Sequence, residues 1–126
     1  MNRAVVDSSV FIAYYWGLDS QHTKAVRIMD ELASSSLIVH PYVIQEVATV
    51  LTKRLGLSIA KRFLAAICEG SNVEIPWVDV HADIDAFQAL KTSLSFTDIT
   101  LIRLAKSTHV ALITFDRQML SLFAET

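Results

Sequence analysis

The sequence has little cysteine and glycine, and it has no long hydrophobic run. Cys68 is the one cysteine among 126 residues, so no disulfide can form within the chain and a reducing, cytoplasmic location is expected. The three glycines, Gly17, Gly56 and Gly70, are scattered, which excludes a glycine-rich phosphate-binding loop. The longest unbroken apolar run, Val10 to Trp16, has seven residues, far below the roughly 20 that cross a bilayer. No basic segment followed by an apolar stretch indicates a signal peptide.

The composition predicts one hydrophobic core and more apolar residues than that core needs. The 126 residues suit a single domain, 1–126. Hydrophobic residues make up 52% of the chain and the mean hydropathy is +0.41, which is high for a small chain without a membrane span. This excess predicts a surface for self-association.

The charges are unevenly distributed. A net charge of −2 argues weakly against a nucleic-acid partner. If four of the 13 acids gather in one site, however, the remaining nine face 11 basic residues, which leaves +2 elsewhere. Two basic pairs, Lys53-Arg54 and Lys61-Arg62, flank the turn expected at Gly56. They are either ordinary solvated helix ends or a cluster that contacts phosphates.

Short apolar runs alternate with longer amphipathic segments. Strands are expected at 4–6, 37–39, 73–75 and 110–113, and helices after residue 7 and over 21–33, 41–55, 57–69, 80–92, 99–108 and 117–123. Strands that alternate with helices are typical of an α/β fold with a parallel sheet. Right-handed crossovers would then bring the carboxyl ends of the strands to one edge.

Four acids are expected at that edge. Asp7 directly follows the first strand and Asp116 comes just after the last one. Glu46 lies about one and a half turns into the helix over 41–55. Asp98 opens the helix that leads to the last strand. Because ligands of open α/β sheets bind beyond the carboxyl ends of the strands, these acids are candidates for one functional site.

Three of the four acids also have a purely structural explanation. Asp7 and Asp116 each stand where an N-cap would start a helix. Ser95 and Asp98 have the spacing of a capping box. Glu46 is too deep in its helix to cap it, and its helical neighbours include apolar residues. We therefore expect Glu46 to be at least partly buried, where an unpaired charge would be costly. The alternative is a glutamate at the border of the apolar face that pairs with Lys53 or reaches water.

Converging carboxylates would favour a hard divalent cation. Oxygen ligands suit Mg²⁺ or Mn²⁺, and Ser9 and Thr114 are placed to orient the carboxylates by hydrogen bonds. Two such ions could activate water and stabilise the leaving oxygen of a phosphodiester. No zinc site is expected, because the histidines at 22, 40, 81 and 109 lack ligand spacing. Only His40, at the end of a strand, merits a test among them.

The ordered set of acidic motifs resembles a known nuclease family. The motifs are Val5-Val-Asp7-Ser-Ser9, Val43-Ile-Gln-Glu46-Val, Leu94-Ser-Phe-Thr-Asp98 and Leu112-Ile-Thr-Phe-Asp116. Together they are similar to the four acidic motifs of PIN-domain nucleases, and most similar to those of VapC-type toxins of toxin–antitoxin pairs. The resemblance covers essentially the whole chain in order and spacing.

The resemblance implies a fold, an activity and partners. The fold is a three-layer α/β/α sandwich around a parallel sheet of four strands, or five if an outer strand follows. The activity is that of a Mg²⁺- or Mn²⁺-dependent endoribonuclease. Asp7, Glu46, Asp98 and Asp116 match the metal-binding acids, and Ser9 and Thr114 match the motif hydroxyls. The implied partners are RNA, a second copy of the chain and an antitoxin whose tail covers the site. Residues 121–126 leave little room for a fifth strand.

Other functional classes compete with this interpretation. A receiver-like phosphoacceptor domain would need an acid after the third strand, where Pro76 and Trp77 follow Ile75. A catalytically silent interaction module would use the acids only as caps. An RNA-processing nuclease would keep the fold and the chemistry without the role of a toxin.

Overall fold

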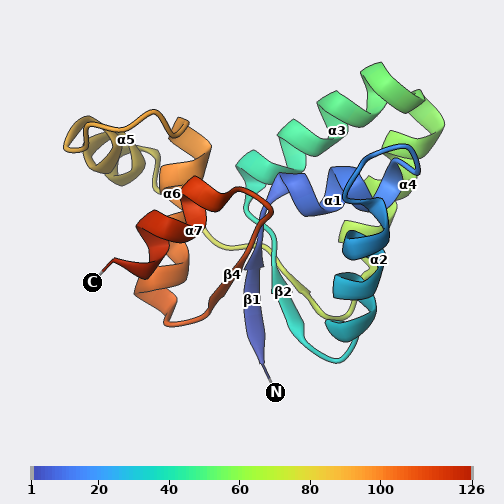
Figure 1. The fold of residues 1–126 in the computed structure, drawn as a ribbon, viewed down its shortest axis with the longest axis horizontal. Helices are drawn as coiled ribbons and strands as arrows, with labels where there is room; N and C mark the ends of the chain where they lie inside the picture. Colours follow the sequence, from blue (N-terminus) through green and yellow to red (C-terminus); the bar gives the residue numbers. More distant parts are fainter. Residues whose placement is uncertain (1, 126) are drawn as a thin grey trace.

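The computed structural model of the protein describes residues 2–125 and has strands flanked by helices on two sides (Figure 1). The elements in order are β1 (Arg3–Val6), α1 (Ser8–Tyr15), α2 (His22–Glu31), β2 (Ser36–Ile38), α3 (Pro41–Leu55), α4 (Leu57–Glu69), β3 (Val73–Glu74), α5 (Val80–Gln88), α6 (Phe96–Thr108), β4 (Ala111–Ile113) and α7 (Arg117–Ala124). Within residues 2–125, no helix is both long enough and apolar enough to span a membrane.

The four strands form one parallel sheet in the order β3-β2-β1-β4. The chain moves outward from β1 through β2 to β3, and then returns to place β4 on the other side of β1. Right-handed crossovers therefore put α1–α4 on one face and α5 and α6 on the other, and Figure 1 shows these two groups of helices on either side of the strands. The strand order reverses beside β1, and this is where open α/β sheets bind ligands.

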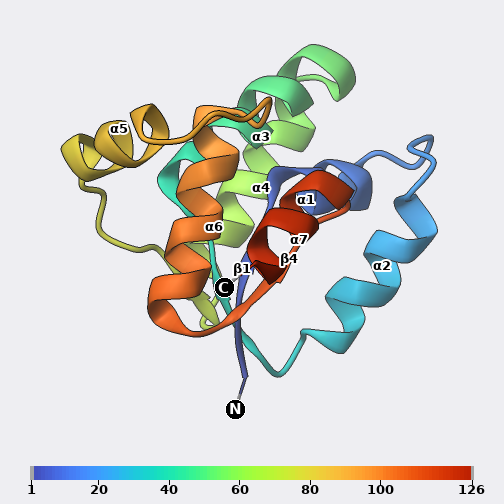
Figure 2. The same cartoon turned by 60° about the vertical axis from the view of Figure 1, so that its left-hand side comes forward.

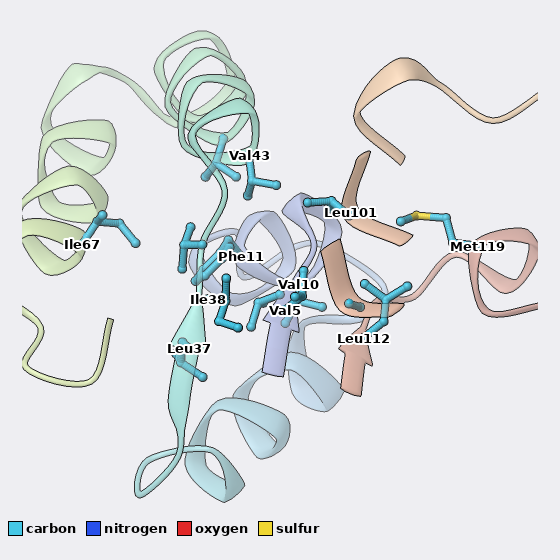
Figure 3. Close-up of a cluster of buried hydrophobic side chains, with 14 of the residues drawn as sticks. Val5, Val10, Phe11, Leu37, Ile38, Val43, Ile67, Leu101, Leu112 and Met119 are labelled. Atoms are coloured by element: carbon cyan, nitrogen blue, oxygen red, sulfur yellow. The ribbon is translucent and has the colours of Figure 1, made fainter. Parts of the chain in front are cut away.

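The core fills the space between the sheet and both layers of helices. Val5 lies on the central strand and is fully buried, as is Val43 on α3. Leu101 on α6 and Met119 on α7 approach the sheet from the other side (Figure 3). Because residues from both layers contact the same strands, the carboxyl ends of the strands are held in a fixed arrangement.

The turn between α3 and α4 depends on a glycine. Gly56 has a φ of +97°, a backbone conformation that residues with a Cβ rarely adopt. It ends α3 through its N–H, which donates to the carbonyls of Leu51 and Thr52. The two basic pairs predicted beside this turn, at 53–54 and 61–62, are exposed on the described surface.

The predicted three-layer α/β/α fold with a parallel sheet is confirmed, while several element boundaries differ from the prediction. The helix expected over 99–108 begins three residues earlier, at Phe96, next to its N-cap Ser95. The helix expected over 80–92 ends at Gln88, because the residues that follow to 93 are exposed and gain nothing by forming another turn. The strand expected at 73–75 stops at Glu74, since Ile75 is exposed and Pro76 has no N–H to donate. Residues 2–125 contain no fifth strand.

Candidate active site

Asp7 lies where β1 gives way to α1, and it is 4% exposed. Its N–H continues the pairing of β1 with β4 by donating to the carbonyl of Ile113 at 2.9 Å. Asp7 occupies the N-cap position of α1, but its side chain makes no capping hydrogen bond. Its Oδ2 instead accepts hydrogen bonds from the hydroxyls of Ser9 at 2.9 Å and Thr114 at 2.7 Å. Helix capping therefore does not explain this carboxylate.

The loop after β4 is tied to the start of α1 by hydrogen bonds in both directions. Thr114 donates to Asp7 and accepts from the N–H of Asp116 at 3.0 Å. Ser9 donates to Asp7 and accepts from the N–H of Phe115 at 3.2 Å. The pairing of β1 with β4 brings these segments together although they are more than 100 residues apart. Both hydroxyls thus fix the position of Asp7 relative to Asp116.

Asp116 caps α7, as its position in the sequence predicted. Its Oδ1 accepts from the N–H of Gln118 at 2.8 Å and of Met119 at 3.1 Å. This cap holds the side chain half-buried at the same edge as Asp7. Asp116 also acts electrostatically on Asp98.

Asp98 is both a cap and a member of the acidic group. Ser95 and Asp98 form the predicted capping box, with the Ser95 N–H donating to Asp98 at 3.0 Å and the Asp98 N–H donating to Ser95 at 3.1 Å. Burial raises the pKa of the Asp98 carboxyl, the hydrogen bonds from Ser95 oppose this rise, and the charges of Asp7 and Asp116 add to it.

The side chain of Glu46 is exposed, although the packing around it still partly desolvates its carboxyl, so the predicted partial burial holds for the carboxyl and not for the residue as a whole. Its neighbours Val43 and Val47 face the core, while Glu46 lies at the border of that apolar face. It still belongs to the acidic group. Desolvation raises the pKa of the Glu46 carboxyl, a hydrogen bond with Ser8 opposes this rise, and the charges of Asp7 and Asp98 add to it.

The acidic group consists of Asp7, Glu46, Asp98 and Asp116, and no basic side chain of residues 2–125 forms an ion pair with it. The ion pairs among residues 2–125 are Arg3–Glu74 and Arg103–Asp83, and neither includes one of these acids. Their donor atoms are carboxylate oxygens, which suit Mg²⁺ and Mn²⁺. Among the same residues, no three side chains of Asp, Glu, His or Cys are close enough together to coordinate a metal ion as they stand. The donor chemistry and the uncompensated charge fit a divalent cation, and the side chains would have to turn toward it.

Two features of this region escaped the sequence analysis. Ser8 is buried, its hydroxyl lies 3.4 Å from Asp7 Oδ1, and its interaction with Glu46 lowers the pKa of that carboxyl. Its position next to Asp7 was the available signal. The other feature is the carboxylate of Asp83, which is buried and accepts hydrogen bonds from Tyr42 of α3 and Arg103 of α6. No local pattern in the sequence predicts it.

Comparisons with known proteins agree with the fold. The chain is similar in structure to VapC20 of Mycobacterium tuberculosis, described as a Sarcin-Ricin loop cleaving toxin, with a TM-score of 0.80, 23% identity and 94% of each chain covered. It is also similar to PAE2754 of Pyrobaculum aerophilum, with a TM-score of 0.65, 20% identity, and coverage of 95% of this chain and 84% of the other. No curated protein matches the chain in sequence. The PIN domain family model matches residues 4–124, and the chain therefore belongs to the PIN domain family.

Proposed function

We propose that this protein is a Mg²⁺- or Mn²⁺-dependent endoribonuclease that acts as the toxin of a type II toxin–antitoxin pair. The observation that carries the proposal is the acidic group at the carboxyl edge of the sheet. There the pKa values of Glu46 and Asp98 are raised by burial and by neighbouring acids, and no cation of the described chain pairs with them. A group of acids kept at such an electrostatic cost is typical of functional sites.

The four acids and two hydroxyls have separate roles in this proposal. Asp7 is the most rigid ligand, because Ser9 and Thr114 fix one of its oxygens. Asp116 is held by its capping bonds and Asp98 by its capping box. Glu46 is the most exposed of them. A bound divalent ion would supply an activated water and neutralise charge on the scissile phosphate.

The role of a toxin is supported by likeness to VapC20, whose description names a toxin that cleaves the Sarcin-Ricin loop. We extend to this chain the class of substrate, RNA, and not a particular target. The resemblance of the acidic motifs to those of VapC-type toxins further implies an antitoxin that covers the acidic group and a homodimer, and we include both in the proposal. The lone Cys68, which is exposed as a free thiol, supports a reducing, cytoplasmic setting.

The basic cluster, Lys53, Arg54, Lys61 and Arg62, is proposed to contact RNA phosphates. All four residues are exposed around the turn at Gly56, and the Arg54 guanidinium lies 5.1 Å from the centre of the Trp16 ring. Replacing Lys53 and Arg54 by Glu should weaken RNA binding and flatten its dependence on salt by about 0.7 in slope per lost phosphate contact. Identical slopes for the variant and the wild type would remove the cluster from the interface.

The test is cleavage of a mixed RNA pool with Mn²⁺, with and without EDTA. Asp7→Asn and Glu46→Gln should each lower the cleavage rate by about 10²-fold or more, because each removes a metal-binding charge. Glu74→Gln is the matched control, since Glu74 is an acid of β3 that pairs with Arg3 outside the acidic group. Cleavage that survives both site substitutions, or EDTA, contradicts the proposal.

A silent interaction module is the second candidate. Asp98 and Asp116 do cap helices, which is all that such a module would require of them. It would not require Asp7 to be held by two hydroxyls, nor Glu46 to face other acids. A protein that folds normally and neither binds Mn²⁺ nor cleaves RNA would favour this candidate.

A further inference from the structure

A buried carboxylate outside the acidic group links three helices. Asp83 lies on α5 and is 7% exposed. Its Oδ2 accepts a hydrogen bond from the hydroxyl of Tyr42 on α3 at 2.8 Å. Its Oδ1 accepts from the guanidinium of Arg103 on α6 at 3.0 Å. Each oxygen therefore has a donor from a different helix, and we name the set Tyr42, Asp83 and Arg103 the Asp83 brace.

Tyr42, the member of the brace on α3, is held in place by His40. His40 caps α3 by accepting the N–H of Tyr42 at 3.0 Å, and the two rings lie 4.2 Å apart. Burial lowers the pKa of His40 while Asp83 opposes this, so the ring is neutral near pH 7 and its Nδ1 can accept. Burial and the bond to Asp83 raise the pKa of Tyr42 to about 12, so its hydroxyl stays protonated and donates.

The brace crosses the boundary between the two groups of helices. α3 packs mainly on α1 and α4, whereas α6 packs on α5, α7, β1 and β4. Figure 2 shows α3 and α4 beside one another, with α6 in front of the strands and α5 to its left. Glu46 belongs to the first group and Asp98 to the second. The acidic group therefore draws its residues from both layers of helices.

The brace also lies close to both acids along their helices. Tyr42 precedes Glu46 by four residues, so the two share one face of α3. The Tyr42 ring packs against Phe96, with centroids 5.6 Å apart, and Phe96 precedes Asp98 by two residues at the start of α6. A small shift at Tyr42 would therefore change the separation of Glu46 and Asp98.

We propose that Asp83 is a positioning residue, which holds α3 and α6 at the separation at which Glu46 and Asp98 would both contribute to binding a divalent ion. This inference rests on the proposed function. An error of about 1 Å in the position of a reacting group can cost about 10²-fold in rate. The interaction of Asp83 with its partners is complete without a ligand, so it can hold the geometry before the ion arrives.

The experiment removes one arm of the brace at a time. Tyr42→Phe deletes the hydroxyl that binds Asp83 and keeps the ring between His40 and Phe96. Arg103→Gln cuts the other arm. Arg3→Gln is the matched control, because it breaks the other ion pair of the described chain, Arg3–Glu74, which is exposed. The readout is the dissociation constant for Mn²⁺, measured from the electron paramagnetic resonance of the free ion, well below the melting temperature of each variant.

Tyr42→Phe and Arg103→Gln should weaken Mn²⁺ binding about tenfold, as the loss of residues that orient metal ligands does, and Arg3→Gln should leave it unchanged. Saturating Mn²⁺ should restore most of the RNA cleavage. A lower melting temperature with unchanged Mn²⁺ affinity would mean that the brace only stabilises the fold, and this would overturn the proposal. If the wild type binds no Mn²⁺, the proposed function fails and the positioning role fails with it, which is a different result from a variant that binds like the wild type.

Discussion

The protein holds two sets of carboxylates that differ in how their charge is met. Asp83 is almost fully buried, and each of its oxygens accepts a hydrogen bond, one from Tyr42 and one from Arg103. Glu46 and Asp98 face other acids instead, and burial together with that repulsion raises the pKa of each. They lie on the same helices, α3 and α6, to which the Asp83 brace is attached.

This difference indicates that Asp83 stabilises the fold, whereas Glu46 and Asp98 are kept at a cost in stability. A buried carboxylate that accepts hydrogen bonds from a cation and a phenol has part of its desolvation cost offset, and removing either partner would leave it poorly satisfied. Acids that repel one another at the carboxyl edge of a sheet lower the stability of the protein, and sites under such strain are candidates for function. The largest expected effects therefore concern activity at the acidic group, and the smaller ones concern stability.

A hydroxyl at the acidic group should matter far more for cleavage than a buried hydroxyl elsewhere. Thr114→Val removes the donor to Asp7 and the acceptor for the Asp116 N–H, so we expect Mn²⁺-dependent cleavage to fall about 10- to 100-fold. Thr100→Val is the control, since buried Thr100 bonds to the Phe96 carbonyl of its own helix. Equal losses in both variants would mean that the two regions do not differ in this way.

Replacing Asp83 should destabilise the protein. Asp83→Asn removes the negative partner of Arg103 and leaves the Tyr42 hydroxyl with a poorer acceptor, so the free energy of unfolding should fall by about 1–3 kcal/mol. For a domain of this size the melting temperature should drop by about 5–10 °C. Calorimetry without metal measures this directly, and an unchanged melting temperature would show that the brace does not contribute to the stability of the fold.

Replacing Glu46 should raise the stability of the metal-free protein, by less than replacing Asp83 lowers it. Because the pKa of Glu46 is raised by folding, its contribution favours the folded state below its ordinary value of 4.5 and is lost as the pH rises through the folded value. Glu46→Gln should therefore raise the melting temperature of the metal-free protein by about 1–3 °C at pH 7, a modest gain because solvent screens this exposed group.

The gain should vanish when the pH falls below 4.5. Glu74→Gln serves as the control, because Glu74 pairs with Arg3. A melting temperature that falls at pH 7 in Glu46→Gln would contradict the view that Glu46 faces uncompensated negative charge.

The fold and the location of the site follow from local patterns in the sequence. Short apolar runs marked β1 and β4, and the acids that follow them, Asp7 and Asp116, could be placed at one edge because parallel strands align their carboxyl ends. The capping box at Ser95 and Asp98 was also readable, because it depends on residues three positions apart.

The rest depends on contacts between distant parts of the chain. Glu46 was expected to be partly buried because apolar residues surround it along α3, but which part of a helix is covered depends on what packs against it. The Asp83 brace joins residues 41 and 20 positions apart, and its residues form no motif. The roles of the acids as metal ligands, and the extent of the domain over 1–126, stay predictions.

The central claim is that Asp7, Glu46, Asp98 and Asp116 hold one or more divalent ions between them. The most direct test is the anomalous X-ray scattering of crystals soaked in MnCl₂. The account predicts a peak about 2.1 Å from carboxylate oxygens of Asp7 and at least two of the other acids, with Glu46 turned toward it. A map without a peak at this edge of the sheet, or with a peak that Asp7 does not touch, would contradict it.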